Sequence, residues 1–352
     1  MNILFVMKHR GNAGNTHAVA NYMRVAPKYG HSVAIYGTPI SYVPELQFSM
    51  DIQRFDRVVY VYESELYRIK PMQEAVMLGK FPRQHRLILD SDGMYNPVVN
   101  IDGYDFNHRD ESERARWIEH LDALGDRIVQ TTFARPINPR ASAMTFYGYN
   151  PALRIDASAT PPKQYDILHV GHNWWRWKQV SSELLPAFEQ IRGQVSEIAF
   201  IGLWWDGPPP EGPAAGPEEA FQSDPEAFRR LRIQTPKAVM YHDVVQTMST
   251  AHINILTQRP VLRHLKHLTL KYFEIFCAET IPLLMLEGGH AEAVYGPAAR
   301  ELVLSGQVAE KLLDALHRPD HYRGIVEDVR RHLIAHYSYD QRVEELIAAV
   351  RN

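Results

Sequence analysis

The stretch NILFVMKHRGNAGNTHAVANYMRVAPKYGHSVAIY, residues 2–36, decides the fold of this chain. It opens with an apolar run at 2–7, continues through a loop at 8–14 and a helical pattern at 17–29, and ends with a β-branched run at 32–36. Strand, loop, helix and strand in this order predict a βαβ unit with two parallel strands. Glycines in the loop let the backbone turn tightly into the helix, whose N-terminus favours anions.

The same alternation of apolar runs and helical stretches continues along the chain. The first half contains further expected strands at 57–62, 86–89, 127–131 and 144–147. A polar segment with three prolines, 150–164, then reads as a linker. Beyond it, strands are expected at 166–170, 198–203, 238–242, 253–256, 281–286 and 302–304, and a helical pattern at 338–351. We therefore predict an α/β protein of two doubly wound, Rossmann-like domains that face a cleft, with the boundary near residue 155.

Composition narrows the class of protein. With 352 residues, of which 45% are hydrophobic, the chain can form two buried cores. A net charge of -3 argues against general nucleic-acid binding through a broad electrostatic field. The single cysteine, Cys277, excludes an intramolecular disulfide and a Cys-based zinc site. Because no apolar stretch can span a membrane and the first one is too short for a signal peptide, we expect a cytoplasmic protein, either free or peripheral to a membrane.

The loops at the carboxyl ends of the strands hold the candidate residues, because ligands of such folds bind there. The first loop reads GNAGNT at 11–16 and brings Gly14 to the start of a helix. It is not the GxGxxG dinucleotide fingerprint, and it suits either an anion site or a tight turn. The loop GHNWWRWK at 171–178 supplies Gly171 and two cations, Arg176 and Lys178, for a nucleotide diphosphate.

The densest candidate is the segment RHLKHLTLKYFE at 263–274. Thr269 precedes a helix expected to begin near Leu270, where a threonine N-cap is favourable. Phosphates can rest on the free amides there, while Glu274, one turn inside, can accept the ribose hydroxyls. The alternative interpretation makes Glu274 a solvent-facing helix carboxylate.

Several of these segments together carry a resemblance to a known family. In chain order they are Tyr241 with Asp243, INIL at 253–256, TLKYFE at 269–274, IPLLML at 281–286 and HYSYDQR at 336–342. Residues 239–342 thereby resemble the C-terminal domain of the retaining glycosyltransferase family 4 group, more specifically its CgeB-like "glycosyl transferases group 1" branch. The first half resembles the same family in its glycine loop, in the helix that carries His17, and in YGYNP at 147–151.

The resemblance implies a GT-B fold and transfer of a sugar from a nucleotide-diphosphate donor to an acceptor hydroxyl. It implies retained anomeric configuration, no bound metal and no cofactor. In the family, the carboxylate at the Glu274 position holds the ribose, and basic residues that match Arg176 and Lys178 hold the diphosphate. The full set expected around the donor is Gly14, Gly171, Arg176, Lys178, Lys266, Thr269, Leu270, Lys271 and Glu274. His17 is the candidate near the reaction centre, or else only a helix residue that faces the cleft.

The resemblance also implies how the chain is divided. Residues 1–155 would form the acceptor side, 156–335 the donor side, and 336–352 a helix that returns to the N-terminal domain. The acceptor is unidentified and can be a glycan, a lipid-linked molecule or a small molecule. Asp90 and Asp92 in LDSDG are the acceptor-side candidates, and a DxD metal pair, as in GT-A enzymes, is the alternative.

One departure from the family keeps other functions open. The wider family has a glutamate eight residues before the position of Glu274, where it touches the donor sugar, and this chain has Lys266. A non-catalytic nucleotide-sugar-binding protein therefore remains an alternative. A nucleotide-sugar epimerase is another, although it needs a carboxylate and histidine set that we cannot assemble. The absent GxGxxG pattern disfavours a Rossmann dehydrogenase.

Overall fold

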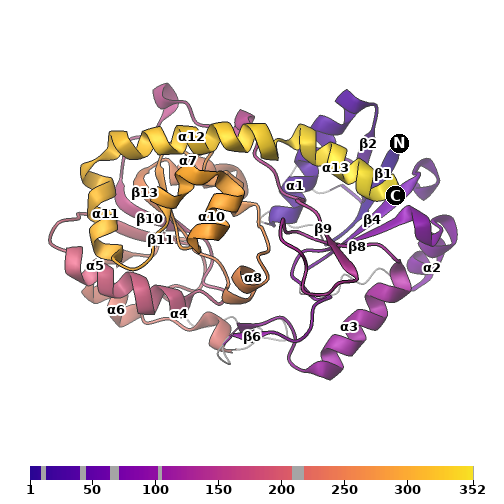
Figure 1. Cartoon of the computed structure of the whole chain (residues 1–352), viewed down its shortest axis with the longest axis horizontal. Coiled ribbons are helices and arrows are strands. Elements are labelled where there is room, and N and C mark those ends of the chain that lie inside the picture. The colour runs from indigo at the N-terminus through magenta and orange to yellow at the C-terminus, as the bar shows by residue number, and fades with distance from the viewer. Residues whose placement is uncertain (9–12, 40–44, 64–70, 102–104, 208–217, 352) are drawn as a thin grey trace.

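The computed structural model of the chain describes residues 1–8, 13–39, 45–63, 71–101, 105–207 and 218–351. Two parallel sheets organise it, and they lie side by side along its long axis (Figure 1). The first sheet has the strand order β3 (Phe48–Ser49), β2 (Ser32–Tyr36), β1 (Asn2–Val6), β4 (Arg57–Tyr62), β5 (Arg86–Asp90), β8 (Ile128–Gln130) and β9 (Ala141–Ala143). The second has the order β12 (Ile233–Gln234), β11 (Ile198–Ile201), β10 (Tyr165–Val170), β13 (Ala251–Leu256) and β14 (Ile281–Leu284).

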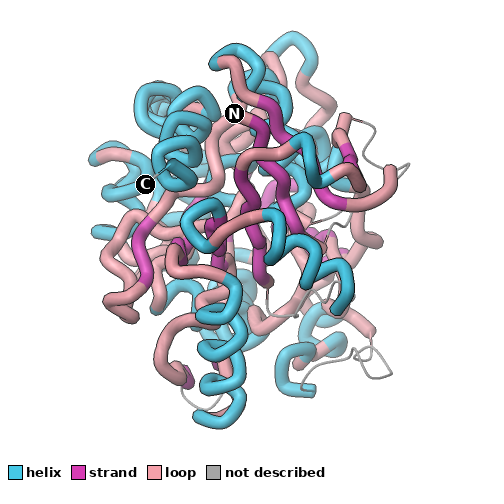
Figure 2. Tube along the Cα trace, turned by 90° about the vertical axis from the view of Figure 1, so that its right-hand side faces the viewer, coloured by secondary structure: helices cyan, strands magenta, loops and turns pink. Residues whose placement is uncertain are grey.

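Helices cover both faces of the sheets, which explains why the strands read as continuous apolar runs. In β1, four consecutive residues from Ile3 to Val6 are buried, and all of β11 is buried. Parallel strands covered on both faces need this composition, because neither side of the strand meets water. Figure 2 shows the strands of the first sheet between layers of helix. The prediction of two doubly wound α/β domains is confirmed.

The covering helices come from the segments between the strands. In the first half they are α1 (Gly14–Val25), α2 (Pro71–Lys80) and α3 (Glu111–Leu124). In the second half they include α4 (Trp177–Gln179), α5 (Leu185–Ile191), α6 (Pro225–Arg230), α7 (Val244–Met248), α8 (Pro260–His264), α9 (Lys271–Glu274), α10 (Gly288–Tyr295), α11 (Val308–His317) and α12 (Pro319–Tyr337). None of the described helices combines the length and apolar character that crossing a bilayer requires.

The last helix, α13 (Tyr339–Arg351), packs against the first sheet and its helix α1 rather than against the second sheet (Figure 1). The Tyr22 ring of α1 meets the Tyr339 ring edge-on at 5.6 Å, and Arg57 of β4 donates to the Val350 carbonyl at 2.9 Å. The chain therefore passes between the halves twice. The two passages lie side by side, since the Tyr149 amide donates to the Tyr337 carbonyl at 2.8 Å.

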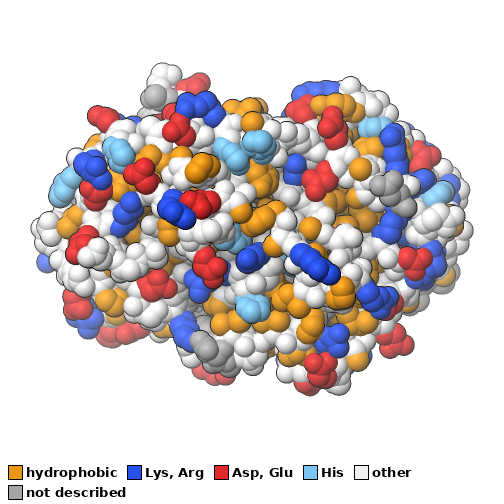
Figure 3. All heavy atoms as spheres, viewed as in Figure 1, with side chains coloured by type: hydrophobic (Ala, Val, Ile, Leu, Met, Phe, Trp, Pro, Cys, Tyr) orange, Lys and Arg blue, Asp and Glu red, His pale blue; other side chains and the backbone are white. Residues whose placement is uncertain are grey.

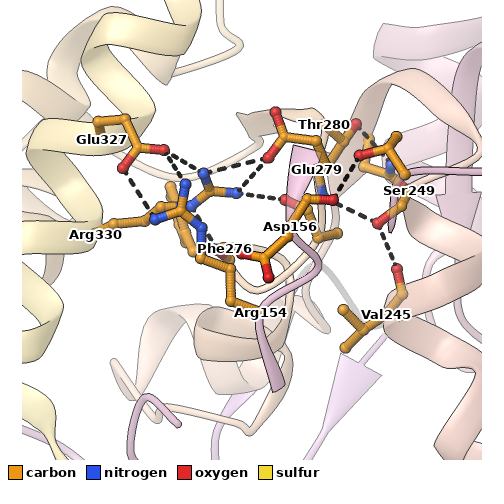
Figure 4. Close-up of polar contacts among 12 residues, drawn as sticks. Arg154, Asp156, Val245, Ser249, Phe276, Glu279, Thr280, Glu327 and Arg330 are labelled. Carbon is orange, nitrogen blue, oxygen red and sulfur yellow. Dashed lines mark hydrogen bonds and ion pairs between the residues drawn. The ribbon is translucent and has the colours of Figure 1, made fainter. Parts of the chain in front are cut away.

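A buried arginine of α12, together with a neighbouring glutamate, holds the linker that follows the first passage against the second half (Figure 4). Arg330 of α12 is 3% exposed and donates to the carbonyls of Phe276 at 2.9 Å and Ala278 at 2.6 Å. Its guanidinium also pairs with the Oε1 atom of Glu327. Both carboxylate oxygens of Glu327 accept hydrogen bonds from Arg154 of the linker. One carboxylate thus joins α12 to the linker.

Three expected strands differ in the structure. The run 144–147 follows a strand instead of forming one: β9 ends at Ala143, and Met144 is buried beyond it. The run 238–242 enters a helical turn, Tyr241–Asp243, and β12 is the strand in that part of the chain. At 302–304 only a single bridge forms, between Val303 and Leu284. In each case apolar residues pack against the fold without forming a strand, which the apolar pattern alone cannot distinguish.

Candidate active site

The carboxyl ends of the two sheets approach each other closely at Gly14 and Leu270. A Cβ added at Gly14, the first residue of α1, would lie 3.2 Å from the Leu270 Cβ, tighter than an ordinary van der Waals contact. Leu270 is the N-cap of α9, so the N-termini of two helices from different halves meet here. The structure therefore brings together two of the loops that the sequence singles out, and it explains why a glycine stands at position 14.

Glu274 is buried at this junction, so the solvent-facing interpretation of this residue is wrong. It is 6% exposed and lies in the single turn of α9. Burial raises the pKa of its carboxyl group, while a hydrogen bond from Tyr241 and the charge of Lys271 oppose that rise. Within the described residues, the Oε1 atom has no hydrogen-bond partner. A buried carboxylate oxygen without a donor is costly, and a ligand hydroxyl would satisfy it.

A histidine from the first half reaches this carboxylate through an aromatic ring of the second half. His17 of α1 is buried and stacks on Tyr241, with ring centroids 3.1 Å apart and an interplanar angle of 7°. Tyr241 in turn bonds to Glu274, and burial followed by that carboxylate raises the pKa of its hydroxyl. His17, Tyr241 and Glu274 therefore form one contact chain across the cleft. That placement leaves the role of His17 in the chemistry a prediction.

Two cations of the second half lie together beside Glu274. Lys271 donates to the Val170 carbonyl at 3.1 Å, and a Cβ added at Gly171 would overlap its ammonium group. Burial and the charge of Arg176 lower the pKa of Lys271 to about 7. Arg176 donates to the His172 carbonyl at 2.9 Å, and burial with the charge of Arg259 lowers its pKa to about 10.

A third cation completes the cluster and links it to the first half. Arg259, which follows β13, pairs with Asp105 of β7 (Asp105–Phe106) at 3.1 Å, and Asp105 is fully buried. Among the described residues, the Nε atoms of both Arg176 and Arg259 lack acceptors. Among the described residues of this cluster, the three cations Arg176, Arg259 and Lys271 face two carboxylates, Asp105 and Glu274. This buried excess of positive charge, with donors still free, matches the charge of a diphosphate.

The remaining donor-side candidates are placed less centrally. Lys178 is exposed in the first turn of α4, two residues beyond the buried part of its loop. Lys266 is exposed as well, in a left-handed backbone conformation with φ of 55°. The predicted threonine N-cap is wrong: Leu270 caps α9, and within the described structure no side chain caps it, because Thr269 lies one residue too early.

The two acceptor-side candidates differ from each other. Asp90 is fully buried, and its oxygens accept from the amides of Met94 at 2.8 Å and Tyr95 at 2.9 Å and from Gln130 at 2.8 Å. This correction makes Asp90 a residue that shapes the loop after β5 instead of one that faces an acceptor. Asp92 is half-buried nearby. In the described ranges, no three His, Cys, Asp or Glu side chains lie together as a metal site.

A polar group near Asp92 was missed from the sequence. The Tyr147 hydroxyl donates to Asn15 at 2.5 Å, and Asn15 donates to Glu63 at 2.7 Å. Both Glu63 and Asp92 act on Tyr147 through their charges. Glu63 directly follows the expected strand 57–62, and this position at a strand end is the signal that could have identified it.

Arg259 and Asp105 were missed for a different reason. Arg259 follows an expected strand closely, but its partner lies in a short hairpin with no motif of its own. Figure 3 shows Lys, Arg and His side chains along the middle of the face, where the two halves meet. The cations that matter are defined by contacts between distant segments, which spacing along one segment does not reveal.

Comparisons with known proteins agree with this geometry. Residues 191–348 match a family model described as glycosyl transferase-like. The chain has the GT-B fold of glycosyltransferases. Residues 191–348 therefore resemble glycosyl transferases, and the chain as a whole shares their fold. The matched segment includes the half-buried Arg259 and Lys271 and the buried Glu274 of the candidate site.

Solved structures resemble this chain along its whole length. A sucrose-phosphate synthase from Thermosynechococcus elongatus superposes with a TM-score of 0.66 at 12% identity, covering 100% of this chain and 98% of that one. T4 phage BGT in complex with UDP-glucose gives 0.61 at 9% identity, with 100% of both chains covered. An alpha-glucosyltransferase in complex with UDP and a 13-mer DNA gives 0.60 at 11% identity, also with 100% of both chains covered. A comparison with curated protein sequences found no match.

Proposed function

We propose that this protein is a glycosyltransferase that moves a sugar from a uridine-diphosphate donor to an acceptor hydroxyl, with retained anomeric configuration and without a metal ion. The observation that supports the proposal is the half-buried cluster of Arg176, Arg259 and Lys271 beside the buried, unsatisfied carboxylate of Glu274. Two of the similar structures described above contain UDP or UDP-glucose, which favours uridine. Retention rests on the resemblance to family 4.

The donor-side chemistry follows from the arrangement of charges. A diphosphate between Arg176, Arg259 and Lys271 would satisfy the free Nε donors and restore a full charge on Lys271. Glu274 would accept the two ribose hydroxyls with its two oxygens. As the sugar leaves, negative charge develops on the diphosphate, and fixed cations in a desolvated site stabilise it most at that moment. Protein cations thereby take the part that a metal ion plays in other transferases.

The acceptor side is proposed to lie on the first half. We propose that residues 1–155 hold the acceptor, residues 156–335 hold the donor, and the helix in 336–352 returns to the first half. Asp92 lies beside the polar group of Asn15, Glu63 and Tyr147 at the strand ends that face the cleft. Hydroxyl-bearing acceptors, such as a glycan, a lipid-linked sugar or a small molecule, suit a site of this chemistry.

The test is a thermal-shift comparison of UDP, GDP, ADP and dTDP, each with and without magnesium. A ligand that binds only the native state raises the melting temperature, so UDP should stand out, and magnesium should add nothing. Release of UDP from UDP-glucose over several turnovers then separates a transferase from a protein that only binds the donor. A shift with UDP without any release of UDP would support the non-catalytic alternative.

A further inference from the structure

Two basic side chains stand at one end of the proposed donor site, beyond the diphosphate cations. In the second sheet β10 is bonded to β13, and β13 to β14. Arg176 follows β10, and Arg259 and Lys271 follow β13. Lys266 lies in the loop before α9, and His290 lies in the first turn of α10, directly after β14. Adjacent residues of the first half link the two: the Thr132 hydroxyl donates to the Lys266 carbonyl at 2.8 Å, and the Phe133 ring lies 5.3 Å from the His290 ring.

His290 presents a buried ring nitrogen that no protein group satisfies within the described residues. It is 5% exposed, and within the described part of the chain its Nε2 atom has no hydrogen-bond partner. Its ring lies 5.3 Å from Phe133 and 5.7 Å from Tyr272, so aromatic rings hold its orientation. Burial and the charge of Lys266 lower the pKa of His290 to about 4, so the ring is neutral at pH 7 and carries one N–H group.

The first turn of α10 adds backbone donors to the same place. This helix has eight residues and begins Gly288-Gly289-His290, directly after β14. The first N–H groups of a helix have no partner inside it. A Cβ added at Gly288 or Gly289 would meet no described atom within 4 Å, so the backbone there is open to a ligand.

The backbone of Lys266 is held firmly although its side chain is exposed. Its carbonyl accepts from the Thr132 hydroxyl at 2.8 Å, and the next residues bond to the first half through His267 with the Ser91 carbonyl at 3.2 Å and Leu268 with the Thr131 carbonyl at 2.6 Å. A lysine with a left-handed backbone is uncommon and needs such support. The Lys266 side chain therefore extends from a fixed backbone position where the two halves meet.

We propose that Lys266, with His290 and the first amides of α10, binds a carboxylate on the donor sugar, so that the donor class is a nucleotide-diphosphate uronate. This inference rests on the proposed function. The Lys266 ammonium and the first amides of α10 are hydrogen-bond donors at pH 7, and neutral His290 can donate from Nε2 in one of its tautomers, whereas the hydroxyls of a neutral sugar need acceptors as well. The exposed Lys266 ammonium adds a full positive charge to this group of donors.

The experiment measures binding of UDP, UDP-glucose and UDP-glucuronate by isothermal titration calorimetry. We compare the unmodified protein, Lys266→Met and a control variant, Lys28→Met, which removes an exposed lysine that pairs with Asp340 in the first half. We expect the unmodified protein to bind UDP-glucuronate at least tenfold more tightly than UDP-glucose, since a charge-assisted bond is worth about tenfold or more. Lys266→Met should abolish this preference and leave the affinity for UDP unchanged, and Lys28→Met should change neither.

Three results would overturn the inference, and they differ in what else they affect. Equal binding of both sugars by the unmodified protein would reject the uronate and leave the transferase intact. If Lys266→Met weakened UDP as much as UDP-glucuronate, the lysine would bind a phosphate. If neither UDP nor its sugars bound, the proposed uridine-diphosphate site itself would fail.

Discussion

The replacement Glu274→Gln tests the donor site most directly, because it changes charge with little change in shape. The amide keeps one oxygen that can accept from Tyr241, so the contact with His17 through that ring is preserved. It removes the negative charge and one of the two acceptor atoms that the ribose hydroxyls would use. Binding and stability should therefore respond in different ways.

The magnitude follows from the bonds that are lost. A hydrogen bond to a charged group contributes about 1.5–3 kcal/mol net. Losing one such bond to ribose and weakening the other should cost about 2–3 kcal/mol. Since about 1.4 kcal/mol corresponds to a tenfold change, the Kd for UDP should rise roughly 30- to 150-fold.

Without ligand, the same variant should be at least as stable as the unmodified protein. Burial raises the pKa of Glu274 in the folded state. A carboxyl group with a raised folded-state pKa lowers the free energy of unfolding as pH rises from its unfolded value through its folded value. Glutamine has no charge to bury, so at neutral pH Glu274→Gln should keep or raise the melting temperature, and the decline of stability above the ordinary carboxyl pKa should become shallower.

Calorimetric titration with UDP and thermal unfolding from pH 4 to 8 check both parts. The control is Glu226→Gln, since Glu226 is an exposed carboxylate paired with Arg229 on α6. A folded Glu274→Gln variant that binds UDP as tightly as the unmodified protein would refute the assignment of the ribose to this carboxylate.

Three further predictions concern stability, pH and space. Arg330→Met should lower the free energy of unfolding in urea by roughly 3 kcal/mol, because it removes a buried charge bonded to two carbonyls. Glu327 is half-exposed, so Glu327→Gln should cost under about 1 kcal/mol. Equal losses in the two variants would contradict this reasoning. Because the pKa of Lys271 is about 7 in the free protein, the affinity for UDP should be highest below pH 7 and fall up to about tenfold per pH unit above it. The affinity of Lys271→Arg should stay constant from pH 7 to 9. A constant affinity in both proteins would place the diphosphate elsewhere. Gly202→Ala should lower the free energy of unfolding by about 1–3 kcal/mol, because the new methyl group would overlap the backbone carbonyl of Gly171. Gly193→Ala, where no described atom lies within 4 Å, should not, and thermal melts of both variants decide.

The sequence predicts the layers of this fold well, because parallel strands buried on both faces leave continuous apolar runs. The runs at 2–7 and 253–256 are nearly the observed strands β1 and β13. The sequence predicts the structure less well where apolar residues lie at the junction between the two halves. Tyr241 lies in a run expected to be a strand, yet its ring packs between His17 and Glu274.

The residues of the candidate site also differ in how far the sequence could predict them. Glu274 and Lys271 lie in one motif, so their proximity follows from helical spacing. The pair of Asp105 with Arg259 joins segments from different halves, and no local pattern encodes such a contact. Asp90 misled because an aspartate at a strand end suits both a ligand site and a loop held by its own amides, and only the hydrogen bonds distinguish the two.

The side-by-side passages at Tyr149 and Ser338 limit how the two halves can move. A single flexible connection would allow a swivel in any direction, whereas two adjacent connections leave one easy rotation, about a line that runs through them. The Tyr149 hydroxyl donates to the Phe276 carbonyl at 3.4 Å, so Glu274 lies within two residues of this pivot. The hairpin of β6 (Asn100–Ile101) and β7 lies on the far side of the molecule from the junction of α12 and α13 (Figure 1). Such a rotation would hold the ribose end almost still and move the hairpin farthest, and it would have to separate both the ion pair of Asp105 with Arg259 and the ring contact of Phe106 with Trp175.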